Sequence, residues 1–140
     1  MTDKARPRAR SRRAKLRKSH EPPPVVATLG WRYHHLGIPT GVRRRGETHL
    51  EKYGLHVTGF PTSPYGIEWM RFDEGCPLHP LIRTVAHVAF EVDDLETEMA
   101  GHEVLIPPNS PSPGLTVAFI VDDGAPVELM QFERPTGRAP

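Results

Sequence analysis

The stretch that decides the fold is a six-residue phrase that occurs twice, first as Ile67-Glu68-Trp69-Met70-Arg71-Phe72 and again as Val127-Glu128-Leu129-Met130-Gln131-Phe132. Both copies run in the order apolar, Glu, apolar, Met, polar, Phe. A second matching pair precedes them, His35-Leu36-Gly37-Ile38 and His87-Val88-Ala89-Phe90. The chain therefore contains two tandem units, in which Glu follows His after 33 residues and after 41 residues. Such a duplication can bring two His and two Glu together around a pseudo-twofold axis.

Length and composition are those of a single domain. The chain has 140 residues, enough to bury a core. It has no run of about 18 apolar residues that would cross a membrane, and no apolar segment typical of a signal peptide follows the basic N-terminus. Cys76 is the single cysteine, which excludes an internal disulfide and favours a cytoplasmic location.

The net charge of +1 hides an asymmetry between the two parts of the chain. Residues 1–20 carry nine Lys or Arg and one acidic residue, a net charge of +8, whereas residues 21–140 carry nine basic and sixteen acidic residues, a net charge of −7. We interpret residues 1–24 as a disordered basic arm. Such an arm can contact nucleic acid or anionic lipid, but it has no interleaved aromatic residues and no apolar face. A solvated extension is therefore favoured, and nucleic-acid binding ranks last.

The periodicity of apolar residues predicts an α+β fold with the element order βαββ followed by βαβββ. A short helix is expected over residues 44–53, and a second one after Asp94, with Leu95 and Met99 on its buried face. Residues 107–114 have the composition of a loop, and residues 122–125 that of a hairpin turn. Strands are expected over residues 31–39, 55–60, 65–72, 84–92, 102–106, 115–121 and 126–132. A duplicated α+β unit of this kind favours two small sheets that enclose a cleft.

Strand alternation places each Glu of the repeat on one face with the Met and Phe that follow it. The predicted pocket surface therefore consists of Met70, Phe72, Met130 and Phe132. A buried carboxylate without a partner costs several kcal/mol, and a divalent cation supplies such a partner. We therefore expect Glu68 and Glu128 to face a metal ion inside this pocket.

The histidines of the repeat follow the same logic. Small residues, Gly37 and Ala89, share a strand face with His35 and His87 and leave room for a ligand. A lone His or Glu on a strand is usually an ordinary surface or core residue, but the doubling of the pattern favours a metal ion. Imidazole and carboxylate together suit Zn, Ni, Co, Mn or Fe(II), and the sequence does not choose among them. The predicted metal ligands are His35, Glu68, His87 and Glu128.

The remaining histidines are interpreted differently. His34 is the rival of His35 for the first ligand position, but only His35 keeps the register of the repeat. The histidines without a repeat partner are interpreted as surface residues, and these are His49, His56, His79 and His102.

From about residue 31 to residue 133 the chain resembles the vicinal oxygen chelate superfamily, which includes glyoxalase I, methylmalonyl-CoA epimerase, extradiol dioxygenases and the bleomycin-resistance proteins. The second unit carries the closer match. Its segment His87-Val88-Ala89-Phe90-Glu91-Val92-Asp93-Asp94-Leu95 is similar to the family's metal-binding strand and following helix, and Gly124-Ala125-Pro126-Val127-Glu128-Leu129 is similar to its closing hairpin.

The resemblance implies two paired βαβββ modules, about 31–72 and 84–133, in a domain that spans residues 25–135 and is followed by a tail at 136–140. The first module is shortened: eight residues fewer separate its ligands, which leaves room for one strand fewer. Residues 40–45 also replace the acidic start of the family's helix.

The resemblance also implies an activity. The four predicted ligands occupy the family's metal positions, and the His/Glu/His/Glu set is most similar to bacterial-type glyoxalase I. A metal-dependent lyase or isomerase is therefore expected, with a small substrate that chelates one divalent ion through adjacent oxygens. Glu128 is then the base and Glu68 the second carboxylate, and a homodimer is implied.

Two alternatives stay open. A sequestering protein of the bleomycin-resistance type would use the apolar cleft without turnover. Extradiol dioxygenases use two His and one carboxylate, so the carboxylate at Glu68 counts against that branch.

Overall fold

A computed structural model describes residues 16–133 of the chain. The first half contains the strands β2 (Arg32–Pro39), β3 (Thr48–Leu50), β4 (Leu55–Thr58) and β5 (Ile67–Phe72). The second half contains β6 (His87–Glu91), β7 (Glu103–Ser112), β8 (Leu115–Asp122) and β9 (Ala125–Phe132). The helices are short: α1 (Pro24–Ala27), the 3-10 turn η1 (Glu51–Tyr53), α2 (Pro80–Thr84) and α3 (Leu95–Met99).

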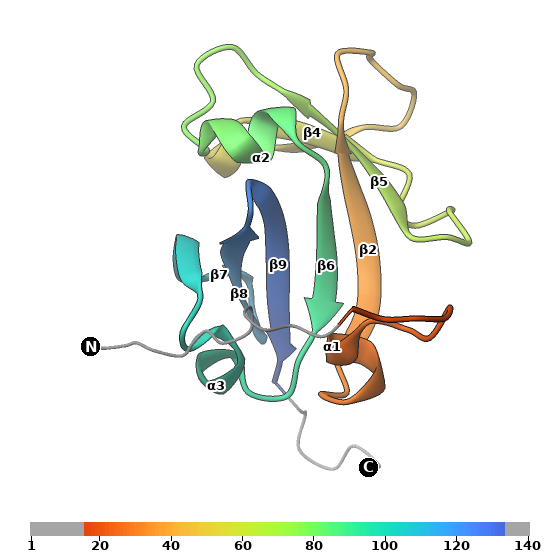
Figure 1. Ribbon diagram of the computed structural model, residues 1–140. Coiled ribbons are helices and arrows are strands. Elements are labelled where there is room, and N and C mark those ends of the chain that lie inside the picture. Colours follow the sequence, from red (N-terminus) through yellow and green to blue (C-terminus); the bar gives the residue numbers. More distant parts are fainter. Residues whose placement is uncertain (1–15, 134–140) are drawn as a thin grey trace.

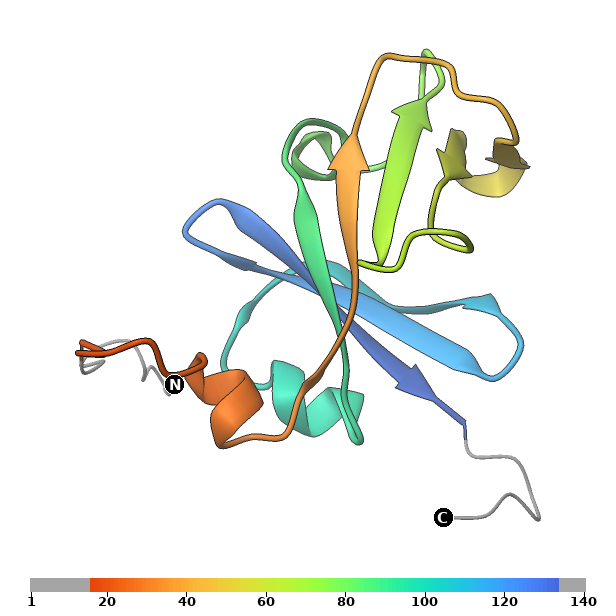
Figure 2. The same cartoon turned by 90° about the vertical axis from the view of Figure 1, so that its right-hand side faces the viewer.

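All eight strands belong to one mixed sheet with the order β3-β4-β5-β2-β6-β9-β8-β7, which curls into a half-barrel (Figures 1 and 2). The central strands β2 and β6 are antiparallel. Each has a parallel neighbour on its outer side, β5 beside β2 and β9 beside β6. Beyond these, β4 and β3 on one side and β8 and β7 on the other continue antiparallel. The strand directions are thus the same when read outward from the centre in either half.

The helices cover the two ends of the central strands. Figure 1 shows α2 near one end of β6 and β9, and α1 and α3 near the opposite end. Leu95 of α3 packs with Trp31 and Leu129 in one buried cluster, and Ile82 of α2 packs with Met70 and Phe119 in another. The expected N-cap of α3 is present, because the side chain of Asp94 accepts a hydrogen bond from the backbone N–H of Thr97.

The strands of the second half have two apolar faces, as strand alternation predicts. On β9, Leu129 belongs to the cluster beneath α3, whereas the neighbouring Met130 belongs to a cluster on the other face. The hairpin between β8 and β9 turns through Asp123 and Gly124, which both have positive φ (52° and 84°). A two-residue turn of this kind matches the twist of the strands, so the predicted hairpin is confirmed.

Two predicted elements are wrong. The helix expected over residues 44–53 is absent; instead β3 pairs with β4, Thr48 opposite Val57 and Leu50 opposite Leu55, and only η1 is helical. A helix this short is not stable on its own, whereas pairing with β4 gives the backbone of residues 48–50 its hydrogen-bond partners. The first half therefore has four strands, as the second half does, and it lacks the predicted helix instead of a strand.

The loop expected over residues 107–114 is also corrected, because β7 continues to Ser112. Its prolines are tolerated there since β7 is an edge strand, where a missing N–H breaks no inner ladder. The pairing of β7 with β8 shifts register three times, and two of these shifts lie at the prolines. The structure also contains the short helix α2, between the strands predicted over residues 65–72 and 84–92, which the sequence did not predict.

The terminal predictions fall largely outside the described residues. Residues 1–15 of the predicted arm and residues 134–140, which include the tail, are not described. Residues 16–23 contain no helix or strand before α1 begins at Pro24. Within residues 16–133, none of the helices has the length and apolar character needed to span a bilayer.

Candidate metal centre and its cavity

The sheet register brings the predicted ligands to the middle of the sheet. Across the central pair, His87 of β6 lies opposite Gly37 of β2, and His35 of β2 lies opposite Ala89 of β6. On the outer sides, Glu68 of β5 pairs with Gly37, and Glu128 of β9 pairs with Ala89. Gly37 thus lies between His87 and Glu68, and Ala89 lies between His35 and Glu128.

Gly37 is required for this arrangement by space. A Cβ atom on Gly37 would lie 2.2 Å from Cε1 of the His87 ring, closer than any real contact. The imidazole of His87 therefore occupies the volume that a side chain at position 37 would fill. The sequence analysis expected Gly37 to leave room for His35 on its own strand. In the structure Gly37 instead makes room for His87 of the neighbouring strand β6.

Three ligand atoms converge at the centre of the sheet. Nε2 of His87 lies 3.1 Å from Oε1 of Glu128, and Nε2 of His35 lies 3.3 Å from the same oxygen. The two Nε2 atoms are 3.4 Å apart. Oε1 of Glu68 is 3.7 Å from Nε2 of His35 and stands just outside this trio.

The trio is buried. The exposed fractions of His35, His87 and Glu128 are 6%, 2% and 9%. Nδ1 of His87 is the single buried side-chain polar atom without a hydrogen-bond partner in the described part of the chain. Leaving a buried polar atom unpaired costs about 1–3 kcal/mol. The unpaired Nδ1 of His87 is therefore a cost to stability at this site.

The protonation tendencies of the carboxylates differ. Burial opposes the charge of Glu128, but hydrogen bonds from His35 and His87 outweigh it and lower the pKa of Glu128 to about 2. Burial raises the pKa of Glu68, and the negative charge of Glu128 adds to this effect. Burial disfavours the imidazolium of His35, yet its contacts with Glu128 and Glu68 raise the pKa of His35 overall.

His34, the rival ligand, also reaches the site. The pairing of β2 with β6 shifts register between Tyr33 and His35, so His34 is the extra residue of a β-bulge. Its Nδ1 lies 2.8 Å from Nδ1 of His35, and its ring stacks on Phe60 with centroids 5.1 Å apart. Burial and the neighbouring charge of His35 lower the pKa of His34. His34 therefore contacts Nδ1 of His35, while Nε2 of His35 faces Glu128 and His87.

The trio and Glu68 lie in the wall of a cavity of about 640 Å³. Met70 and Met130 line it, as predicted from the sequence. Phe72 and Phe132 do not; Phe72 packs against the cluster around Ile82, and Phe132 lies near the ring of His34. Apolar residues that the sequence did not assign to the pocket include Leu50, Tyr53, Leu55, Phe60, Ile82, Ile106 and Phe119. They were missed because they come from β3, β4, α2, β7 and β8, outside the repeated phrase.

The donor set fits a divalent metal ion. A tetrahedral ion with bonds of about 2.0–2.1 Å needs donor atoms about 3.3–3.4 Å apart. The separations of 3.1, 3.3 and 3.4 Å among the trio are close to this requirement. The bond between His34 and His35 is the kind of outer contact that orients a metal-binding imidazole. His35, His87 and Glu128 are thus positioned to hold a metal ion, with Glu68 beside them.

Comparisons with known proteins show similarity of fold alone. No protein-family model matches the sequence, and no curated protein is significantly similar to it. The chain is similar to the crystal structure of a hypothetical protein from Bacillus halodurans C-125, with a TM-score of 0.57 and 17% identity. The match covers 78% of this chain and 99% of the other. The fold is therefore shared with a known structure.

Proposed function

We propose that this protein is a divalent-metal-dependent lyase or isomerase of the vicinal oxygen chelate type. The observation that carries the proposal is the convergence of two imidazole nitrogens and a carboxylate oxygen within 3.1–3.4 Å in the wall of a largely apolar cavity. The matching order of strand directions in the two halves supports a pair of modules joined at β2 and β6. The substrate would be a small molecule with two adjacent oxygens and an apolar body.

The proposed roles follow from the contacts. His35 and His87 hold the site with Glu128, and when bound, a divalent ion would act as a Lewis acid that stabilises negative charge on substrate oxygens. Glu128 is the proposed base. Its contacts with two imidazoles hold its pKa low, so it becomes basic enough only if those contacts lengthen when substrate enters.

Glu68 is proposed as the second carboxylate. It makes one longer contact, to His35, and its side chain is 23% exposed against 12% for Glu128. Its raised pKa suits a group that returns a proton to the substrate. A pair of carboxylates with pKa values pushed apart is the arrangement used to divide acid and base roles.

The apolar lining supports a second candidate function, which is sequestration of a small molecule without turnover. Twelve of the cavity residues are Leu, Ile, Val, Met or Phe, and such a surface can hold a flat apolar ligand. Metal dependence separates the two functions, because sequestration should survive loss of the ligand residues.

Proton abstraction can be tested directly by NMR in D₂O. Small 2-hydroxycarbonyl and 2-oxo compounds would be incubated with the protein, with and without Zn, Ni, Mn or Fe(II), and exchange of the hydrogen next to the carbonyl would be followed. The proposal predicts metal-dependent exchange that is lost in Glu128→Gln. Tight binding of an apolar compound without metal, and no exchange of any compound, would instead favour sequestration.

A further inference from the structure

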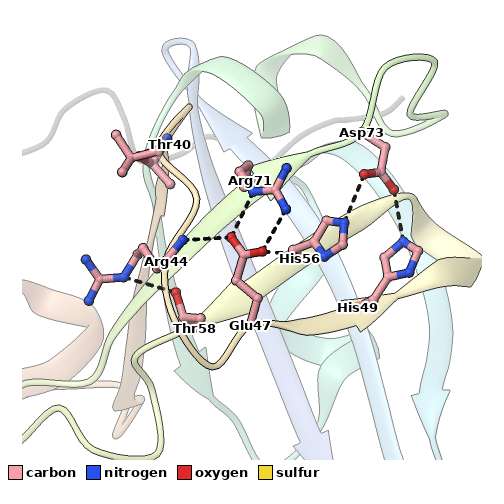
Figure 3. Close-up of polar contacts among 9 residues, drawn as sticks. Thr40, Arg44, Glu47, His49, His56, Thr58, Arg71 and Asp73 are labelled. Carbon is pink, nitrogen blue, oxygen red and sulfur yellow. Dashed lines mark hydrogen bonds and ion pairs between the residues drawn. The ribbon is translucent and has the colours of Figure 1, made fainter.

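A second group of ligand-type side chains lies outside the cavity, and we call His49, His56 and Asp73 the outer cluster. The pairing of β3 with β4 places His49 directly opposite His56. Asp73 follows β5 immediately, and Figure 3 shows its carboxylate directed at both imidazoles. The three residues thus come from β3, from β4 and from the residue directly after β5, three neighbouring strands at one side of the sheet.

The geometry of the outer cluster is ordered. Nε2 of His49 lies 3.0 Å from Oδ2 of Asp73, and Nε2 of His56 lies 3.1 Å from Oδ1. The two rings are stacked, with centroids 4.1 Å apart and planes within 8°. All three ligand atoms lie within 4.8 Å of one another. Nε2 of each ring therefore faces the carboxylate of Asp73.

A carboxylate behind the cluster orients one of the rings. Oε1 of Glu47 lies 3.7 Å from Nδ1 of His56, on the side away from Asp73. Arg71 holds Glu47 with two hydrogen bonds of 2.8 and 2.7 Å (Figure 3). The bond from Arg71 is the main reason that the pKa of Glu47 falls to about 2, so Glu47 stays charged. The charge of Glu47 near Nδ1 would favour a proton on Nδ1 once Nε2 of His56 binds a metal ion.

The cluster is accessible and correctly charged for a cation. The side chains of His49, Asp73 and His56 are 45%, 34% and 20% exposed, so one side of the group is open to water. The hydrogen bond from His49 is the first cause that lowers the pKa of Asp73, which keeps its carboxylate ionised. Two imidazoles, one carboxylate and one water make up a common tetrahedral donor set for zinc.

We propose that His49, His56 and Asp73 form a second, outer site for a divalent ion of the zinc class. The site would join β3, β4 and the end of β5 through one ion. Leu50 follows His49 directly, and both Leu50 and Tyr53 line the cavity. The ion would therefore fix the part of the cavity wall that is built from β3 and η1.

The outer site can be tested by titrating the metal-free full-length protein with Zn²⁺ and following the histidine ring nitrogens by ¹H–¹⁵N NMR. We expect the Nε2 signals of His49 and His56 to shift together as one site fills. His49→Gln and Asp73→Asn should each weaken this binding by at least about tenfold. His20→Gln, which removes an exposed histidine without a described partner, is the matched control and should bind as the wild type does.

The result that overturns the proposal is equally specific. The proposal is overturned if Zn²⁺ leaves the signals of the His49 and His56 rings unchanged, or if both variants bind as tightly as the His20→Gln control. The outer cluster would then be a set of hydrogen bonds between strands and not a metal site. Occupation of the cavity site is visible in the same spectra through His35 and His87, so the failure of one site does not obscure the other. His49 is the most exposed member of the cluster, so its variant should remain folded, and circular dichroism checks this.

Discussion

Gly37 illustrates how one residue controls the candidate centre. The ring of His87 lies over it, and an added Cβ would meet Cε1 at 2.2 Å. Its backbone does not require glycine, because its φ lies outside the left-handed region. The restriction on this position therefore comes from contact with a predicted metal ligand and not from chain conformation.

Gly37→Ala should displace the His87 ring and weaken metal binding at the cavity site by at least about tenfold. Overpacking of this kind also costs about 1–3 kcal/mol of stability. Gly41→Ala is the matched control, since a Cβ there has no atom within 4 Å and φ is again outside the left-handed region. Isothermal titration with Zn²⁺ would measure both variants in a chain that also carries His49→Gln, so that the outer cluster does not contribute. Equal affinities would mean that His87 is not a ligand.

Glu128→Gln should lower turnover by about 10²–10⁴ once a substrate is known, because an amide cannot accept the proton. Gln keeps an oxygen at the position of Oε1, so most of the bound metal should remain. Comparison of kcat with metal content separates the two effects. A variant that turns over normally would remove Glu128 from the role of base.

At the scale of elements, local patterns predicted the strands of the repeat, the cap of α3 and the hairpin turn. The alternation around Glu128 and the Asp-Gly turn depend on neighbouring residues, so they could be derived from the sequence. β3 and β7 could not, because each depends on a partner strand: Leu50 pairs with Leu55, and the proline-rich end of β7 is held by β8. The bulge at His34 and the place of Phe60 in the cavity likewise depend on packing between strands.

The outer cluster escaped the repeat pattern for the same kind of reason. His49 and His56 have no counterparts in the second half, and a repeat gives no signal for them. Their positions on either side of the turn at Tyr53-Gly54 would have indicated a cross-strand pair once residues 48–58 were interpreted as a hairpin. The incorrect prediction of a helix over residues 44–53 removed that possibility.

The clamp between Glu47 and Arg71 joins the β2–β3 connection to β5 and should make stability depend on pH. The pKa of Glu47 is lowered from 4.5 to about 2. Its contribution to stability is therefore fully present above about pH 4.5 and is lost as the pH falls toward about 2. In urea unfolding of metal-free protein, Glu47→Gln should be less stable than the wild type at pH 6, and this difference should shrink toward about pH 2.

The control for this prediction is Glu74→Gln, which alters an exposed carboxylate with no described ion pair. Its unfolding midpoint should follow that of the wild type at every pH. A stability difference for Glu47→Gln that stays constant from about pH 6 to about pH 2 would show that the charge of Glu47 does not contribute.

At the scale of the whole molecule, the antiparallel junction of β2 and β6 places both halves of the candidate centre in one sheet. The repeated phrase predicted that two histidines and two glutamates would meet, and three of the four lie within 3.4 Å of one another. The fourth, Glu68, stands 3.7 Å from His35 on the side of the first half. The assignment to a vicinal oxygen chelate protein and the expected homodimer stay predictions.

The most direct test of the central claim is the metal content of the purified protein, measured by mass spectrometry beside a Glu68→Ala/Glu128→Ala double variant. Both proteins would carry His49→Gln, so that the outer cluster does not contribute. We predict about one divalent ion per chain, lost in the double variant. Absence of metal from both proteins, even after addition of Zn, Ni, Mn or Fe(II), would contradict the metal centre and leave sequestration in the apolar cavity as the function to pursue.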